Sequence, residues 1–158
     1  MKFVISSNLL SQRLQTLGRV IPSKNSMPIL DNFLFQVVDG KLTLTASDNE
    51  ITLRTTLELV ESDGNLSFAV NAKTLQDAMK EIPEQPLEFT VNPDGLEIRV
   101  DFQNGHYTLV GQNADEYPVT KGLEGEVSTL VVDAQRLHSS VSRSLFAAAD
   151  DPLRPVMN

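Results

Sequence analysis

Hydrophobic positions at the start of the chain change from an alternating pattern to a helical one. Lys2–Ile5 alternates with a period of two, which is typical of a half-buried strand, and Ser6 is suited to cap a helix. Apolar side chains then recur three or four positions apart, at Leu10, Leu14, Leu17 and Ile21. This spacing places them on one helix face, so the chain opens with a strand, a polar cap and an amphipathic helix.

The same strand, cap and helix pattern returns twice. Phe68–Val70 is followed by Asn71, which stands 65 positions after Ser6. Leu130–Val132 is followed by Asp133, which stands 127 positions after Ser6. We therefore expect three strand and helix openings of the same kind.

Chance similarity is the alternative to a true repeat, because any two strand and helix units share apolar periodicity. The caps, however, are in register at all three places. In addition, Pro155 stands 127 positions after Pro28, the same offset as the third cap. These matches favour an internal repeat.

Short turn signals separate the strands expected between the copies. Asp39–Gly40, Pro93–Gly95 and Asn104–Gly105 each lie between alternating apolar runs, and such segments are strong hairpin signals. Each repeat is therefore expected to be a strand, a helix and three antiparallel strands. Units of this composition predict an α+β fold.

Domain boundaries follow from the repeat. Two units fill residues 1–120, which we expect to form one domain. Residues 121–128 contain glycines and alternating charges and predict a linker. Residues 129–158 hold only the opening of a third unit, the truncated start of a second domain. Its apolar helix face would have nothing of its own to pack on, so we expect the natural protein to be longer.

Composition narrows the class of protein. The chain has no cysteine, which excludes a disulfide framework and thiol-ligated metals and favours a reducing, cytoplasmic compartment. It contains no apolar run long enough to span a bilayer, so no membrane association is expected. The net charge of -8 taken alone argues against nucleic acid as a partner.

The distribution of charge changes this picture. We expect helices over residues 7–20, 72–81 and 134–149, whose only acidic residues are Asp77 and Glu81. Their basic residues are Arg13, Arg19, Lys73, Lys80, Arg136 and Arg143. If the helices share one surface, that surface is mildly basic and suited to a polyanion. Ordinary solvated helix faces are the alternative, and the sequence leaves both open.

Candidate catalytic residues are few. His106 falls on an expected strand, and His138 falls on an expected helix with no carboxylate one turn away. Asp48 and Glu50 stand two positions apart and could form a general-base or metal pair, although a turn explains them more simply. Gly111–Asp115 lacks the second glycine and the lysine of a phosphate loop. No catalysis, cofactor or metal is therefore expected.

Four segments, in order along the chain, resemble the bacterial DNA polymerase III sliding clamp (beta subunit) family. Met27–Asn32 resembles its Pro-Ile-Leu-x-Asn segment, and Thr45–Glu50 resembles its Thr-Ala-Thr-Asp-x-Glu turn. Ala114–Pro118 is similar to the acidic, aromatic and proline end of its first domain. Arg154–Asn158 is similar to the arginine-led strand that opens its second domain, although Pro155 and Val156 depart from members with aromatic residues there.

The resemblance implies a DNA-clamp fold, in which each domain is made of two β-α-β-β-β units with helices on one face and antiparallel sheets on the other. It implies a homodimeric ring that encircles double-stranded DNA without sequence preference and keeps the replicative polymerase on its template as a non-catalytic processivity factor. The clamp loader and other proteins with clamp-binding peptides are the further partners that it implies.

Site residues follow from the resemblance position by position. The positions expected to face DNA are Lys24, Lys73, Lys80, Arg13 and Arg143. Tyr107 and Leu109 match edge-strand positions of the dimer interface, and Arg154 and Met157 match part of the peptide pocket.

Two further functions remain open at this stage. A β-rich adaptor that binds peptides and never meets DNA would suit the net charge of -8. A hydrolase would use Asp48 and Glu50 as its catalytic pair.

Overall fold

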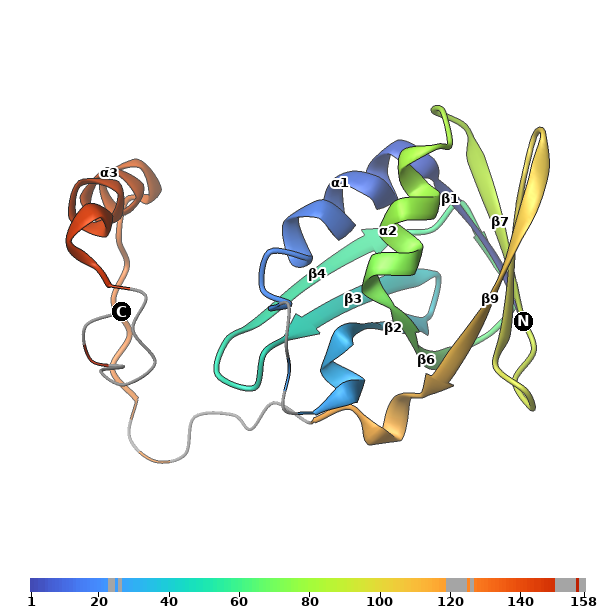
Figure 1. The fold of residues 1–158 in the computed structure, drawn as a ribbon, viewed down its shortest axis with the longest axis horizontal. Coiled ribbons are helices and arrows are strands. Elements are labelled where there is room, and N and C mark those ends of the chain that lie inside the picture. Colours follow the sequence, from blue (N-terminus) through green and yellow to red (C-terminus); the bar gives the residue numbers. More distant parts are fainter. Residues whose placement is uncertain (23–24, 26, 119–124, 126, 150–155, 157–158) are drawn as a thin grey trace. The chain divides into compact units, whose positions relative to one another are not determined.

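The computed structural model describes residues 1–22, 25, 27–118, 125, 127–149 and 156 (Figure 1). The chain divides into two units, Met1–Thr120 and Lys121–Asn158. Each unit is described by itself.

The first unit contains two copies of the expected order of elements. The first copy consists of β1 (Lys2–Ser6), α1 (Ser7–Leu17), the 3-10 turn η1 (Pro28–Asp31), β2 (Asn32–Val38), β3 (Lys41–Ser47), β4 (Thr52–Glu58) and the two-residue β5 (Glu61–Ser62). The second copy consists of β6 (Leu66–Asn71), α2 (Ala72–Lys80), β7 (Pro86–Val91), β8 (Glu97–Phe102), β9 (Gly105–Asn113) and the 3-10 turn η2 (Ala114–Glu116). The expected α+β fold is therefore confirmed.

The two copies exchange their first strands. The strands lie in the order β4-β3-β2-β6-β9-β8-β7-β1-β5. The strand that precedes α1 therefore pairs with β7 of the second copy, and β6, which precedes α2, pairs with β2 of the first copy. Neither copy completes its four-stranded sheet without the other, so the two copies form one folding unit.

Turn chemistry fixes the register of the first hairpin. Val38 lies opposite Lys41, which leaves Asp39 and Gly40 as the turn. Both have positive φ angles, 49° and 74°, the conformation that a two-residue turn needs to match the twist of the strands. In the last hairpin Phe102 lies opposite Gly105, so the turn lies one residue earlier than its Asn-Gly signal indicated.

Stacked phenylalanines join the two halves of the sheet at the centre of the core. Phe3 of β1 stacks on Phe89 of β7 with 4.7 Å between ring centroids, and Phe35 of β2 stacks on Phe68 of β6 at 5.1 Å. Phe35 also contacts Phe89 at 6.4 Å. All four rings are buried, and each buries enough apolar surface to stabilise the fold substantially.

A smaller core lies on the other face of the first half of the sheet. Tyr117 is buried there, and its hydroxyl donates a hydrogen bond to the carbonyl oxygen of Asn32 at 3.3 Å. The residues around it are Ile29, Leu30, Leu34, Ala69 and Ala114. This cluster fixes the end of the first unit against β2.

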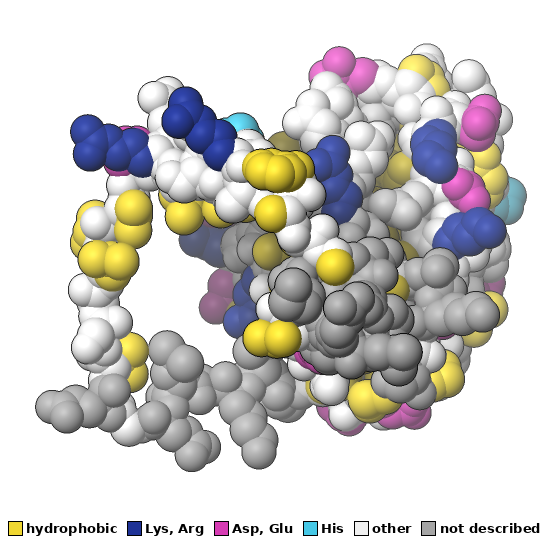
Figure 2. All heavy atoms as spheres, turned by 60° about the vertical axis from the view of Figure 1, so that its left-hand side comes forward, with side chains coloured by type: hydrophobic (Ala, Val, Ile, Leu, Met, Phe, Trp, Pro, Cys, Tyr) yellow, Lys and Arg dark blue, Asp and Glu magenta, His cyan; other side chains and the backbone are white. Residues whose placement is uncertain are grey.

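The second unit contains α3 (Ala134–Ser144) and the 3-10 turn η3 (Leu145–Ala147). The helix is shorter than the expected range 134–149. The expected strand at Leu130–Val132 is absent, so that prediction was wrong. A strand needs a neighbouring strand to accept and donate its backbone hydrogen bonds, and among the described residues this segment has no such neighbour. Hydrophobic and basic side chains gather on different sides of this unit (Figure 2).

All three predicted helix caps are confirmed. The side chains of Ser6, Asn71 and Asp133 accept hydrogen bonds from the backbone N–H three residues further on. Each cap satisfies a donor that the helix itself leaves free. The sequence offsets of 65 and 127 therefore relate equivalent structural positions.

Candidate nucleic-acid interface

Helices α1 and α2 lie side by side over one face of the sheet (Figure 1). The side-chain amide of Gln76 in α2 donates to the carbonyl oxygen of Leu14 in α1 at 2.9 Å. Gly18, which caps the C-terminal end of α1, lies against this contact: a Cβ atom there would be 2.3 Å from Nε2 of Gln76. The glycine therefore leaves room for the side-chain amide of Gln76 at this contact.

The exposed sides of these two helices are basic. Arg13 lies on α1, which has no acidic residue, and Arg19 lies directly after the Gly18 cap at the end of this helix. Lys73 and Lys80 stand seven positions apart on α2, which is two helical turns, so they share one side. All four side chains are exposed. The two helices brought together by the fold thus present four cations to solvent.

Asp77 of α2 forms an ion pair within this basic surface. Nζ of Lys80 lies 2.9 Å from Oδ1 of Asp77, and the hydrogen bond from Lys80 together with its positive charge lowers the pKa of the Asp77 carboxyl. Lys73 lowers it further in the same direction. Both members of the ion pair are exposed, so water screens the pair and it contributes little to the stability of the fold.

Two hollows lie along the seam between the helices. The first has a volume of about 240 Å³ and is lined by Ser11, Leu14, Gln15, Gly18, Arg19, Gln76, Met79 and Lys80. The second has a volume of about 340 Å³ and is lined by Gly18, Ile21, Pro22, Asp31, Asn71, Ala72, Lys73 and Gln76. Cations and amide groups at their rims are the groups that contact phosphate oxygens in protein–DNA interfaces.

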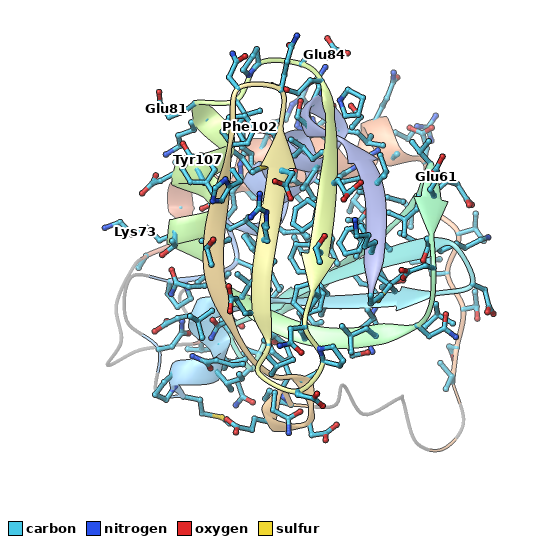
Figure 3. The ribbon with its side chains drawn as sticks, turned by 90° about the vertical axis from the view of Figure 1, so that its right-hand side faces the viewer. Glu61, Lys73, Glu81, Glu84, Phe102 and Tyr107 are labelled. Carbon is cyan, nitrogen blue, oxygen red and sulfur yellow. The ribbon has the colours of Figure 1, made fainter. Side chains whose placement is uncertain are left out.

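The expected interface residues Tyr107 and Leu109 lie on β9, on the sheet face that carries the helices. Tyr107 is half-buried and stacks on Phe102 of β8 with 5.4 Å between ring centroids (Figure 3). β9 pairs with β8 over Gly105–Val110, whereas β6 pairs with β9 only from Gly111 onwards. Within the described residues, Gly105–Val110 therefore has one edge without a strand partner.

The structure does not bring all of the expected site residues together. Lys24, Arg154 and Met157 lie outside the described residues. Arg143 lies exposed on α3 of the second unit. Of the residues expected to face DNA, Arg13, Lys73 and Lys80 thus share the pair of helices in the first unit.

The candidate catalytic pair has a structural role. The carboxylate of Asp48 accepts hydrogen bonds from the backbone N–H groups of Glu50 and Ile51 at 2.9 Å and 2.6 Å, so it holds a turn between β3 and β4. His106 and His138 are exposed. Among the described residues, no three His, Cys, Asp or Glu side chains are grouped closely enough to hold a metal ion. None of the helices described is long and apolar enough to cross a membrane.

The uncharged polar side chains between α1 and α2 were not predicted from the sequence. Gln15 and Gln76 line the hollows beside the cations, and neither was a candidate. The sequence feature at this contact is Gly18, directly after the helical pattern. A glycine in that position indicates the end of a helix and does not predict a contact with Gln76.

The fold defines the class of protein. The solved structure of the DNA polymerase III subunit beta from Pseudomonas aeruginosa matches with a TM-score of 0.87 and 26% identity, covering 100% of this chain and 42% of that chain. The Helicobacter pylori beta clamp bound to a DNA ligase peptide matches with a TM-score of 0.84 at 22% identity, over 96% of this chain and 41% of that one, a likeness of fold alone. The fold is that of bacterial sliding clamps.

The family follows from the sequence. Residues 1–121 match the sequence-family model of the DNA polymerase III beta subunit, N-terminal domain. The chain therefore belongs to this family. The beta sliding clamp of Haemophilus influenzae is 28% identical over 158 residues, which is 100% of this chain and 43% of that protein. The chain thus spans less than half the length of this curated relative.

Proposed function

We propose that this chain is the first domain and the start of the second domain of a DNA sliding clamp, a non-catalytic processivity factor for DNA replication. The observation that carries the proposal is the pair of side-by-side helices, which present Arg13, Arg19, Lys73 and Lys80 on the fold of the clamp family. Residues 1–120 form the first domain, residues 121–128 the linker and residues 129–158 the start of the second domain. The complete protein acts in the cytoplasm.

The basic helices meet the sugar-phosphate backbone of double-stranded DNA. Lys24 and Arg143 add to this surface in the complete ring. Long, exposed side chains such as Lys73 make loose contacts with phosphates that carry no sequence information, so the protein can move along the duplex. The chain as a whole is acidic, which limits other contacts with nucleic acid.

The free edge of β9 is the dimer interface in this proposal. Unpaired backbone N–H and C=O groups at Gly105–Val110 can extend the sheet with a strand of a second subunit. Tyr107 and Leu109 then cover the seam on the helical side of the sheet. The result is a homodimeric ring, and the described part of this chain supplies one edge of each interface.

Peptides of the replicative polymerase, the clamp loader and other replication proteins bind the complete clamp. The beta clamp of Helicobacter pylori has been solved with a DNA ligase peptide bound to it. Arg154 and Met157 contribute to the peptide pocket of the present protein.

A retention assay tests the ring. The complete gene product, loaded by its clamp loader, should remain on nicked circular DNA at high salt and leave once the circle is cut. Equal retention on linear and circular DNA would show that binding does not depend on encirclement. A DNA-independent adaptor, the alternative that the net charge favours, predicts that primer extension is unchanged when Lys24, Lys73 and Lys80 are all replaced by Glu.

A further inference from the structure

A hollow of about 490 Å³ lies on the sheet face opposite the helices, away from the basic surface. Its floor is a row of three directly adjacent residues on neighbouring strands, Leu34 of β2, Thr45 of β3 and Arg54 of β4. Tyr117 and Pro118 form a wall at the end of the first unit. The volume is within the range of small-molecule sites, which is about 300 to 1,000 Å³.

Thr45 is the unusual member of this row. Its side chain is 2% exposed, and its Oγ1 atom is the one buried side-chain polar atom within the described residues that has no hydrogen-bond partner. A buried hydroxyl without a partner destabilises a protein, and such groups are rare. Thr43, two positions earlier on the same face, instead pairs with the hydroxyl of Thr56 at 3.2 Å.

Arg54 supplies an available positive charge beside this hydroxyl. Its exposed guanidinium makes no ion pair or side-chain hydrogen bond with the other residues that the structure describes. A guanidinium next to a hydroxyl suits a carboxylate, which accepts hydrogen bonds from both. Asp115 at the rim disfavours a ligand of high negative charge.

The remaining walls combine apolar and uncharged polar groups. Leu34, Ala114, Pro118 and the ring of Tyr117 give the hollow its apolar surface, and Gln36 and Ser67 also line it. The hydroxyl of Tyr117 already donates to Asn32, so its ring offers an apolar surface. From these observations we propose that the hollow binds a small monocarboxylate with a flat apolar body, whose carboxylate is held by Thr45 and Arg54.

Titration with sodium benzoate tests the site. Backbone amide signals of the 158-residue chain are followed by NMR, and saturable shifts are expected at Thr45, Arg54 and Tyr117 with a dissociation constant of about 1 mM, ordinary for so small a ligand. Arg54→Gln should weaken binding roughly tenfold, because a charge-assisted hydrogen bond is lost. Thr45→Val should weaken it severalfold, whereas the matched control Thr43→Val should leave it unchanged.

Each other outcome contradicts the proposal. Absence of saturable shifts up to about 50 mM benzoate, or equal binding by wild type and Arg54→Gln, would show that these residues form no carboxylate site. Inorganic phosphate binding as tightly as benzoate would show that the apolar walls contribute nothing. Binding of an acidic peptide, but not of benzoate, would mark a docking surface for a protein instead. The exposed Arg54→Gln variant keeps the test valid if Thr45→Val fails to fold.

Discussion

Gln76 of α2 is hydrogen-bonded to the main chain of Leu14 in α1, and the contact joins the helices of the two repeated units. The carbonyl oxygen of Leu14 also accepts from the N–H of Gly18 at 2.8 Å. The end of α1 and the middle of α2 are therefore held by the same acceptor. The contact therefore links the two helices that carry the basic side chains.

Gly18→Ala should lower the free energy of unfolding by about 1 to 2 kcal/mol, because the new Cβ atom displaces Gln76 and breaks its hydrogen bond. The backbone at Gly18 has φ -62°, which alanine adopts easily, so the effect comes from the contact and not from strain. Urea unfolding of the 158-residue chain measures it.

A double-mutant cycle gives the control. In a Gln76→Ala background the obstructing side chain is gone, and Gly18→Ala should then lower the free energy of unfolding much less. Equal costs in the two backgrounds would show that Gln76 does not respond to the side chain at position 18.

Charge reversal at Arg13, Lys73 and Lys80 should weaken binding of the complete protein to linear DNA, where phosphate contacts and not encirclement hold it, and flatten the dependence of this binding on salt. Each lost phosphate contact lowers the slope of log affinity against log salt by about 0.9. A control with the same change in net charge replaces Lys2, Lys41 and Arg99, which lie on strands, by Glu. Identical salt profiles for the two triple variants would mean that only total charge matters.

Asp77→Asn should strengthen binding of the complete protein to linear DNA severalfold at moderate salt. The substitution removes the one carboxylate that pairs with Lys80 and leaves its ammonium free for phosphate. Asp94→Asn, in the turn between β7 and β8, makes the same change in charge away from the helices and should have little effect. Fold stability should change little, because the ion pair is exposed to solvent, and thermal unfolding can check this.

Tyr117 should make stability depend on pH at the alkaline end. Burial raises its pKa to about 12, whereas the ordinary value is near 10. Between these values the unfolded chain loses the phenolic proton and the folded chain keeps it. Stability is therefore fully present below about pH 10 and is lost as the pH rises toward 12.

Tyr117→Phe should remove this contribution. The difference in unfolding free energy between wild type and Tyr117→Phe, measured in urea at pH 8, 10 and 11.5, should shift by about 1 to 2 kcal/mol in favour of the variant as the pH rises. A constant difference across these pH values would mean that Tyr117 does not titrate with unfolding.

Local features were predictable because they depend on neighbouring residues alone. Ser6, Asn71 and Asp133 were identified as caps from their place before an apolar helical pattern, and the turn at Asp39–Gly40 from its dipeptide. Each rests on hydrogen bonds or φ angles within a few positions of the chain. The strand at Leu130–Val132 was wrongly predicted because a strand also needs a partner that local pattern does not supply.

The repeated order of elements in the first unit, the caps and the basic composition of the helices follow from the amino-acid pattern alone. The pairing of β1 with β7, and of β6 with β2, which lets two similar units complete each other's sheets, became known from the fold. The fold also brings Gln76 to Leu14 and places Thr45 beside Arg54. Propensities and caps act over a few residues, whereas the choice of strand partner depends on the burial of side chains far apart in the chain, such as Phe35 and Phe89.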